Sequence, residues 1–190
     1  MRESYHDELA ATTNDVVTMA QLVRTAVADA TSALINADLQ VAEKVISNDE
    51  KVDALSEGIE QRSFDLLARQ APVAGELRTV IALLRMTYEL SRMGDLAVHV
   101  AETARLRYPD HAVPEPVAQQ FDEMARLADG MIATATRTLI DRDAQGAERL
   151  ATEDSAVDDL RSEQFRLLFS DDWTYGVEKA VDTALLGRYY

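Results

Sequence analysis

The run from Pro72 to Tyr108 is the feature that most constrains the fold of this chain. Proline suits the first turn of a helix, because its missing N–H would have no partner there, and the next proline is Pro109. A single helix over this run would be about 50 Å long at roughly 1.5 Å per residue. Spacings of three and four, typical of a helix in a bundle, connect Leu77, Ile81, Leu84, Tyr88, Ser91, Asp95 and Val98.

Ser91 and Asp95 interrupt this stripe, because they stand where Leu or Val would be expected. A carboxylate on an apolar stripe is costly unless it is paired, hydrogen-bonded or bound to a metal. The run by itself leaves two interpretations open. Asp95 is either a salt-bridged residue at a solvated end of the bundle or a ligand.

The composition narrows the class of protein. The 190 residues include only 7 Gly and 4 Pro, which favours long helices. Cysteine is absent, so neither a disulfide nor a thiolate metal site can form, and this fits a cytoplasmic protein. The first residues lack the apolar core of a signal peptide, and no apolar run approaches the roughly 20 residues that cross a bilayer.

A net charge of −15 disfavours nucleic acid and bare anionic membranes as partners.

Apolar residues at helical spacing predict six helices. We expect them over residues 4–36, 38–69, 72–108, 116–141, 144–170 and from 175 to the end, with Asp38 as the N-cap of the second. A cluster of prolines between 109 and 116 marks a boundary between two halves. The last helix still follows its pattern at Tyr190, so we expect it to be truncated there.

The two halves repeat at an offset of 105 residues. The motif D-x-x-V-D occurs twice in register, as Asp49, Val52 and Asp53 and again as Asp154, Val157 and Asp158. Such a repeat dictates architecture. It predicts an all-α protein of two tandem antiparallel three-helix bundles, residues 1–111 and 112–190.

Three of the acids are predicted to meet. Asp49 lies 22 residues before the turn near residue 71, and Asp95 lies 24 residues after it. In an antiparallel pair both would therefore stand at one level, about 33–36 Å from the turn, with Asp53 one helical turn from Asp49. Oxygen ligands of this kind suit Mg, Ca, Mn or Fe. His99, one turn beyond Asp95, is a further candidate ligand.

These residues resemble the PhoU family of phosphate-uptake regulators. The run Gln70-Ala71-Pro72-Val73-Ala74-Gly75-Glu76-Leu77-Arg78 resembles the family element Q-x-P-x-A-x-D-L-R. Ser91-Arg92-Met93-Gly94-Asp95 is similar to its E-R-I-G-D signature, and Asp49-Glu50-Lys51-Val52-Asp53 to its first acidic motif. The similarity covers essentially the whole chain, and the run from Val181 to Tyr190 is most similar to actinobacterial members.

The resemblance implies two three-helix bundles whose acidic motifs bind iron, zinc, manganese or magnesium. The metal ligands expected on this basis are Asp49, Asp53, Asp95, Asp154 and Asp158. Ser91 replaces a family Glu, so we expect any ion in the first bundle to be weakly held. The E-R-x-x-D motif of the second bundle would begin right after Tyr190, so we expect its ligands on the last helix to be missing here.

The resemblance also implies a cytoplasmic, non-enzymatic negative regulator of phosphate uptake and of phosphate-responsive two-component signalling. Its expected partners are the ATPase of the phosphate ABC transporter and a sensor histidine kinase, with membrane association only through them. We also expect a homodimer.

Two alternatives belong to other functional classes. A carboxylate-bridged di-iron bundle needs paired Glu-x-x-His motifs, and the chain offers one, from Glu3 to His6. A histidine phosphotransfer bundle needs an exposed acceptor such as His99 in the middle of a helix. No Gly-rich phosphate loop or nucleophile elbow occurs in the sequence, which favours a binding protein over an enzyme.

Overall fold

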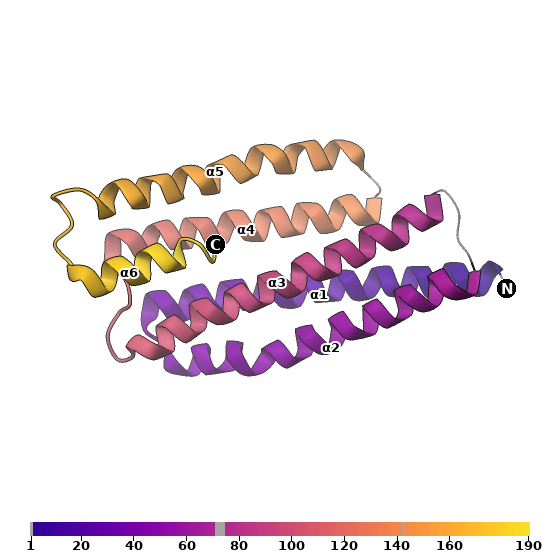
Figure 1. The fold of residues 1–190 in the computed structure, drawn as a ribbon, viewed down its shortest axis with the longest axis horizontal. Helices are drawn as coiled ribbons and strands as arrows, with labels where there is room; N and C mark the ends of the chain where they lie inside the picture. Colours follow the sequence, from indigo (N-terminus) through magenta and orange to yellow (C-terminus); the bar gives the residue numbers. More distant parts are fainter. Residues whose placement is uncertain (1, 71–74, 142) are drawn as a thin grey trace.

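All regular structure described for this chain is α-helical, as predicted. A computed structural model describes residues 2–70, 75–141 and 143–190. Its helices, in chain order, are α1 (Arg2–Asn36), α2 (Leu39–Gln70), α3 (Gly75–Arg107), α4 (Glu115–Asp141), α5 (Ala144–Leu168) and α6 (Gly176–Leu186) (Figure 1). Pro72, predicted to open the third helix, lies outside the described residues.

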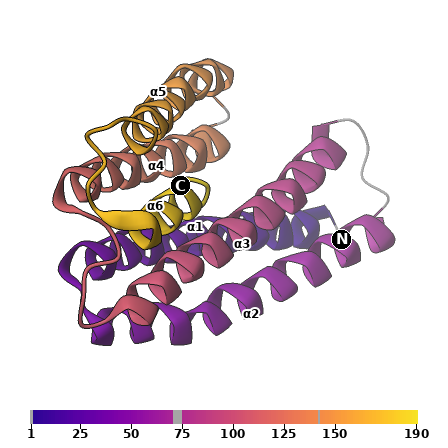
Figure 2. The ribbon, with the colours of Figure 1, turned by 60° about the vertical axis from the view of Figure 1, so that its left-hand side comes forward.

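The first three helices form an antiparallel bundle, and the second half of the chain is built onto it. Helix α4 packs along α1, and α5 packs on the side of α4 away from the first bundle (Figures 1 and 2). The predicted boundary between residues 111 and 112 falls in the connection between α3 and α4. The division into two domains related by the internal repeat stays a prediction. None of the helices in the described ranges is long and apolar enough to cross a membrane.

The apolar seams predicted for α1 and α2 are confirmed. The buried side chains include Leu9, Val16, Val23, Ala30 and Leu34 on α1, and Ala42, Val45, Val52, Ile59 and Leu66 on α2. Their near-heptad spacing keeps one stripe of each helix turned toward its neighbours over the full length of the bundle.

The seam predicted for α3 is wrong. The residues that α3 buries are Val80, Leu83, Thr87, Leu90, Gly94, Ala97, Val100, Ala101 and Ala104. Tyr88, assigned to the seam, is 69% exposed, and Asp95 is exposed as well. The error has a physical cause, since small residues such as Gly and Ala pack where helices approach closely but add little hydrophobicity to a sequence pattern. Asp95 therefore lies at the surface and does not interrupt the core.

The turn between α1 and α2 follows the predicted capping. Ala37 adopts a left-handed backbone with φ of 50°, and the Asp38 N–H donates to the Ala33 carbonyl at 3.0 Å. The Asp38 carboxylate then accepts hydrogen bonds from the backbone N–H groups of Gln40 (2.9 Å) and Val41 (3.1 Å). Asp38 thus supplies partners for N–H groups that have none inside the helix.

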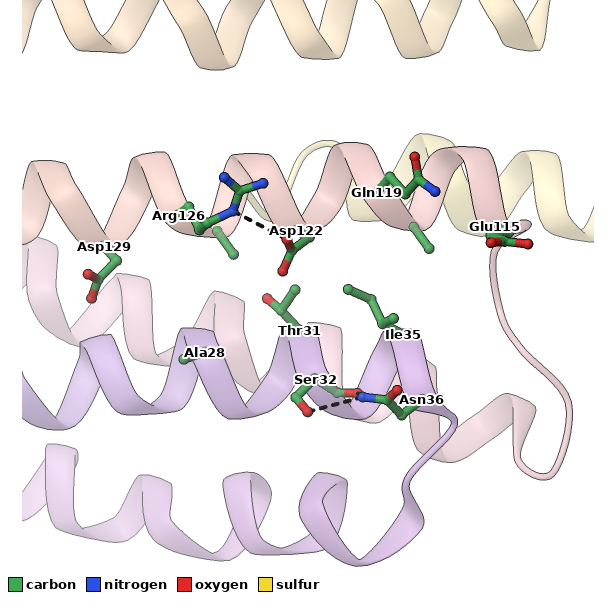
Figure 3. A pocket seen from close by; sticks show the side chains of 12 residues that line it. Ala28, Thr31, Ser32, Ile35, Asn36, Glu115, Gln119, Asp122, Arg126 and Asp129 are labelled. Carbon is green, nitrogen blue, oxygen red and sulfur yellow. Dashed lines mark hydrogen bonds and ion pairs between the residues drawn. The ribbon is translucent and has the colours of Figure 1, made fainter.

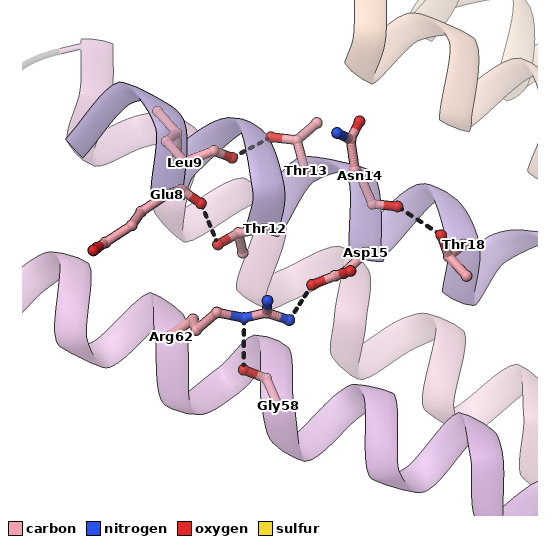
Figure 4. A network of polar contacts seen from close by, with 9 residues as sticks. All are labelled: Glu8, Leu9, Thr12, Thr13, Asn14, Asp15, Thr18, Gly58 and Arg62. Atoms are coloured by element: carbon pink, nitrogen blue, oxygen red, sulfur yellow. Dashed lines mark hydrogen bonds and ion pairs between the residues drawn. The ribbon is translucent and has the colours of Figure 1, made fainter. Parts of the chain in front are cut away.

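Polar contacts also fasten the opposite end of the α1–α2 pair (Figure 4). The Arg62 guanidinium on α2 pairs with Asp15 on α1 and donates to the Gly58 carbonyl at 3.3 Å. Nearby threonines of α1 donate to carbonyls one turn earlier, as Thr12 does to Glu8 at 2.8 Å. Their hydroxyls are satisfied within α1, so Arg62 and Asp15 form the polar link between the two helices here.

Apolar packing and two arginines join the halves of the chain. One apolar cluster includes Val100 of α3, Phe121 of α4 and Leu186 of α6. Arg24 of α1 pairs with Asp129 of α4. Arg107 of α3 donates from Nε and Nη2 to the Asp182 carboxylate of α6, at 2.6 and 3.0 Å. The second half is therefore held to the first by charge as well as by apolar burial.

The prediction that the last helix runs through Tyr190 is wrong. Helix α6 ends at Leu186, and a Cβ on Gly187 would lie only 2.9 Å from the Gln164 side chain, so glycine fits where the chain turns. The Tyr190 hydroxyl lies 2.6 Å from that of Thr31, and its ring stacks on Phe121 with centroids 5.2 Å apart. After the turn, the half-buried Tyr190 side chain thus contacts both α1 and α4.

Candidate functional site

Three carboxylates from α2 and α3 converge as predicted. Ligand oxygens of Asp49, Asp53 and Asp95 all lie within 4.8 Å of one another. Asp49 and Asp53 are four residues apart and so share one face of α2, while Asp95 approaches from α3. We call these three residues the acidic cluster. It can offer several oxygen ligands to one cation, although ion binding itself stays a prediction.

Gly94 allows the two helices to approach at this level. A Cβ built on Gly94 would lie 3.3 Å from Cγ1 of Val52 and 3.4 Å from Oδ1 of Asp49. Glycine inside a helix costs about 1 kcal/mol relative to alanine. Its presence here is explained by the close packing of α3 on α2, which brings Asp95 toward Asp49.

The acidic cluster is electrostatically strained. Asp49 is half-buried, and its pKa is raised above the ordinary value chiefly by burial, with further increases from the negative charges of Asp53 and Asp95. Nearby His99 acts weakly in the opposite direction. A bound cation would relieve the repulsion among the three carboxylates.

His99 lies outside the acidic cluster. Its Nδ1 atom is 3.2 Å from the Glu102 carboxylate, and its ring centroid lies 5.3 Å from that of Tyr189. Arg105 contacts the same Glu102 at 3.8 Å and Glu43 at 3.5 Å. These contacts use His99 and Glu102 in a polar network at the surface, and so do not support the role of His99 as a fourth ligand.

The acids of the second half are not brought together in the same way. Asp154 and Asp158 are exposed on α5, and Asp158 pairs with Arg161 at 2.9 Å. Within residues 2–70, 75–141 and 143–190, neither belongs to a group of three possible metal ligands. Their predicted role as metal ligands stays a prediction.

Metal chemistry can be judged from the donor set. Three carboxylates fit Mg²⁺, Mn²⁺ or iron, whereas protein sites for Zn²⁺ usually include imidazole or thiolate ligands. Ser91, one turn before Asp95, is half-buried and is not a carboxylate, which the resemblance led us to expect at this position. The residues present thus fit an oxygen-preferring cation held by few protein ligands, with water completing its coordination.

An open groove between α1 and α4, which no sequence pattern indicated, is a further feature of the structure (Figure 3). It has a volume of about 860 Å³, and its lining includes Thr31 and Ile35 of α1 and Asp122 and Arg126 of α4. Arg126 is paired with Asp122 along α4, on one wall of the groove, at 3.2 Å. The groove arises because α4 lies along α1, and a sequence pattern cannot show which two of six helices are adjacent.

The chain is similar along its length to known proteins. The PhoU domain model matches residues 16–104. The chain is 43% identical over 190 residues to the phosphate-specific transport system accessory protein PhoU homolog 2 of Mycobacterium tuberculosis, covering all of this chain and 89% of that protein. It is 30% identical over 189 residues to the corresponding PhoU homolog of Aquifex aeolicus, covering 96% of this chain and 83% of that one.

Two crystal structures share the fold. PhoU from Pseudomonas aeruginosa matches with a TM-score of 0.90 at 24% identity, covering 97% of this chain and 89% of that one. The phosphate transport system regulatory protein PhoU from Streptococcus pneumoniae matches with a TM-score of 0.84 at 23% identity, covering 97% and 87%. The motifs that suggested a resemblance, the all-helical fold and the full-length identity to the mycobacterial protein agree, and the chain belongs to the PhoU family.

Proposed function

We propose that this chain is an accessory regulator of phosphate uptake that restrains phosphate-responsive signalling. The observation that carries the proposal is the 43% identity, over the whole chain, to a protein named as an accessory protein of a phosphate-specific transport system. Such relatives are accessory proteins and not enzymes. The chain is accordingly a non-enzymatic protein that acts by binding.

The regulator would act by docking in the cytoplasm. Its partners would be the ATPase of the phosphate ABC transporter and a sensor histidine kinase, and it would reach the membrane only through them. The net charge of −15 supports partners that carry basic patches, because opposite charges steer association. This steering weakens as salt is raised.

The acidic cluster would bind a divalent cation and thereby shape the docking surface. Support comes from the convergence of three carboxylates within 4.8 Å and from the raised pKa of Asp49. A bound Mg²⁺, Mn²⁺ or iron ion would neutralise negative charge and so reduce the repulsion among the three carboxylates of the acidic cluster. Asp154 and Asp158 would contribute a second acidic surface on α5.

The test uses a strain in which the native gene is deleted and a phosphate-responsive reporter is read in phosphate-rich medium. Loss of the regulator should leave the reporter constitutively active, and the wild-type chain should restore repression. A variant with Asn at Asp49, Asp53, Asp154 and Asp158 should fail to restore repression while keeping its helical circular dichroism.

A matched variant controls for the loss of four charges. Asn at Asp7, Asp110, Asp171 and Asp172 removes exposed acids elsewhere and should leave repression intact. If the first variant still represses, the acids have no regulatory role. If the purified wild-type protein shows hydrolase or oxidase activity, the regulator interpretation is wrong and the di-iron alternative gains support.

Metal content is measured separately. Elemental analysis of protein purified without chelators should find less than one equivalent of Mn, Fe or Mg, because Ser91 replaces a carboxylate. The Asp49→Asn variant should lose that content and the matched variant should keep it. Equal metal content in both would show that the acidic cluster is not the site.

A further inference from the structure

The open groove between α1 and α4 has one acidic wall (Figure 3). Glu115, Asp122 and Asp129 line the groove from α4 and are spaced by seven residues. They therefore stand about 10 Å apart along that helix, with Ala118 and Ala125 between them. We call the three carboxylates the acidic wall.

Ion pairs neutralise only part of the acidic wall. Asp129 is paired, because Arg24 of α1 donates two hydrogen bonds to its carboxylate, at 2.6 and 2.9 Å. Glu115 is exposed and forms no ion pair with any residue in the described ranges. Its charge is therefore not balanced within the described part of the chain.

Asp122 shares its arginine with a neighbour. Arg126 lies 3.2 Å from Asp122 and 2.5 Å from Glu123, so one positive charge serves two carboxylates. The three side chains are between 43% and 65% exposed, and exposed pairs within one helix contribute little to stability. A base from outside can therefore compete for Asp122. Two negative positions about 10 Å apart remain on the wall, at Asp122 and Glu115.

The floor of the groove is made of small side chains whose polar groups are satisfied. Ala118 and Ala125 are buried. The buried Thr31 hydroxyl donates to a carbonyl one turn earlier at 2.7 Å and lies 2.6 Å from the Tyr190 hydroxyl. The floor therefore needs no hydrogen bond from a ligand, and its small residues allow another backbone to approach closely.

The shape of the groove fits a helix. Helices α1 and α4 lie side by side, and the groove follows both of them (Figures 1 and 3). Its lining residues recur at steps of three or four, as Ala28, Thr31 and Ile35 do on α1. A third helix presents side chains at the same steps and can interdigitate with both walls. An extended peptide, whose side chains alternate about every 3.3 Å, has no such match.

We propose that this groove binds a helix of a partner protein that carries two basic residues seven positions apart beside a stripe of small apolar residues. The basic residues pair with Glu115 and Asp122, and the small residues pack on Ala118 and Ala125. The inference rests on the proposed function, because it names the surface and the kind of partner element that the docking would use.

The α1 side of the groove sets the orientation of that helix. Ala28, Ser32 and Asn36 line this side, and none of them is charged. The partner therefore needs basic residues only on the flank that faces α4. Anionic membranes and nucleic acid are repelled by the acidic wall. A second copy would have to offer a different face to the groove, and such head-to-tail contacts continue into filaments unless they close a ring.

The test uses a synthetic helical peptide of about 18 residues, long enough to span roughly 27 Å. It carries two arginines seven positions apart beside a stripe of leucine and alanine. A second peptide has glutamate in place of both arginines, and a third has its arginines five positions apart, on different faces of the helix. Fluorescence anisotropy with the full chain at about 0.15 M salt should show the first peptide binding at least about tenfold more tightly than either control.

Charge-reversed variants locate the binding. Glu115→Lys with Asp122→Lys should weaken binding of the first peptide at least about tenfold, because like charges then face each other. Asp171→Lys with Asp172→Lys makes the same change of net charge at exposed positions outside the groove. This matched variant should bind the peptide as the wild type does.

A second pair of variants tests shape without changing charge. Ala28 is exposed, so Ala28→Trp fills the groove without entering the core, and it should abolish binding of the first peptide. Ala11→Trp lies on an exposed position of α1 outside the groove and should leave binding unchanged. Binding that survives Ala28→Trp would mean that the peptide lies elsewhere, and overturns the proposal.

Other outcomes overturn the proposal as well. One is a wild-type chain that binds none of the peptides at about 100 µM, or all three equally. Displacement of the first peptide by an equal concentration of spermine would show a site for any linear polycation. A sedimentation coefficient that changes with Ala28→Trp would assign the groove to a second copy of the chain.

The reporter strain separates this inference from the proposed function. Glu115→Lys with Asp122→Lys should fail to restore repression, and the matched variant should restore it. If deletion of the native gene leaves the reporter silent, the proposed function fails, and peptide binding alone decides whether the groove accepts a basic helix. If deletion activates the reporter and the groove variant still represses fully, the regulator stands and the groove is not its docking surface.

Discussion

Arg24 on α1 donates two hydrogen bonds to the Asp129 carboxylate on α4, at 2.6 and 2.9 Å. The two residues are 105 positions apart, which is the offset of the internal repeat. In the sequence alignment of the two halves at this offset, the contact joins equivalent positions. The hydrogen bonds and positive charge of Arg24 lower the pKa of Asp129 below its ordinary value.

The first prediction concerns this pair. A carboxyl group whose pKa is lowered by folding stabilises the folded state above its unfolded pKa of about 3.9. That stabilisation is lost as the pH falls through the lower folded pKa. Both side chains are partly exposed, so Asp129→Asn should cost only about 0.5–1 kcal/mol at pH 7. In urea unfolding, the wild type and Asp129→Asn should have the same free energy of unfolding below about pH 3.

Asp122→Asn is the control, because its pair with Arg126 is within one helix and exposed. Its effect should be about 0.3–0.5 kcal/mol. A loss for Asp129→Asn that is the same at pH 7 and at pH 2.5 would mean that packing, and not charge, is responsible.

The second prediction concerns Gly94. Alanine there gains about 1 kcal/mol of helix propensity but must fit 3.3 Å from the buried, β-branched Val52. Overpacking costs about 1–3 kcal/mol, so we expect Gly94→Ala to destabilise the protein by about 1 kcal/mol. Gly130→Ala on α4 meets nothing within 4 Å and should instead stabilise by about 0.5–1 kcal/mol. Thermal unfolding of both variants measures the contrast, and stabilisation by both would show that Gly94 is not needed for helix contact.

The third prediction uses the strained turn at Ala37. A left-handed backbone costs a residue with a Cβ about 1–2 kcal/mol, and glycine avoids that cost. Ala37→Gly, where φ is 50°, should therefore raise the free energy of unfolding by about 0.5–1 kcal/mol in urea. Ala54→Gly, on an exposed position inside α2, should lower it by about 1 kcal/mol. Opposite changes in the free energy of unfolding would distinguish the effect of the turn from a general effect of glycine. A decrease in both variants would contradict the left-handed backbone at Ala37.

The fourth prediction concerns the raised pKa of Asp49. Folding favours the protonated form of this carboxyl group, so at pH 7 its charge weakens the folded state. With metal ions removed by a chelator, Asp49→Asn should unfold at a higher urea concentration than the wild type at pH 7. The difference should disappear below the unfolded pKa of about 3.9, where both states of the wild type are protonated.

Added Mn²⁺ should reverse this order at pH 7, because a ligand that binds only the folded state stabilises it. The wild type should then shift to higher urea concentration and Asp49→Asn should not. A wild-type curve that does not move with millimolar Mn²⁺ would count against a cation in the acidic cluster.

Much of the fold could be predicted because α1 and α2 carry large apolar residues at regular spacing. Val16, Val23, Val52 and Ile59 are buried where the pattern expects them. The buried face of α3 was not predicted correctly, since at Gly94 and Ala97 it is made of small residues. Their burial depends on how closely α2 approaches, which is a property of the packed bundle.

The acidic cluster could be predicted for a different reason. Asp49 and Asp95 lie at similar distances in residues from the turn between α2 and α3. Because the rise per residue of a helix is nearly constant, their positions along the bundle follow without any knowledge of the core. Asp95 is exposed and does not break an apolar stripe, contrary to the prediction, and yet the three carboxylates meet. The pairing of Arg24 with Asp129 and the path of Tyr190 could not be predicted, because both depend on α4 packing against α1.

Among the described helices, α1 is translated before the helices that pack on it, and both halves are built against it. When residue 107 has emerged, α2 and α3 can cover two sides of α1, while the side with Arg24 and Thr31 still awaits α4. The apolar residues of α4 that face α1 can therefore pack on an existing surface once they have left the ribosome. A chain started at residue 112 would lack that template, with Phe121 left without its partners on α1. The order of synthesis therefore allows the two halves to assemble in the same order.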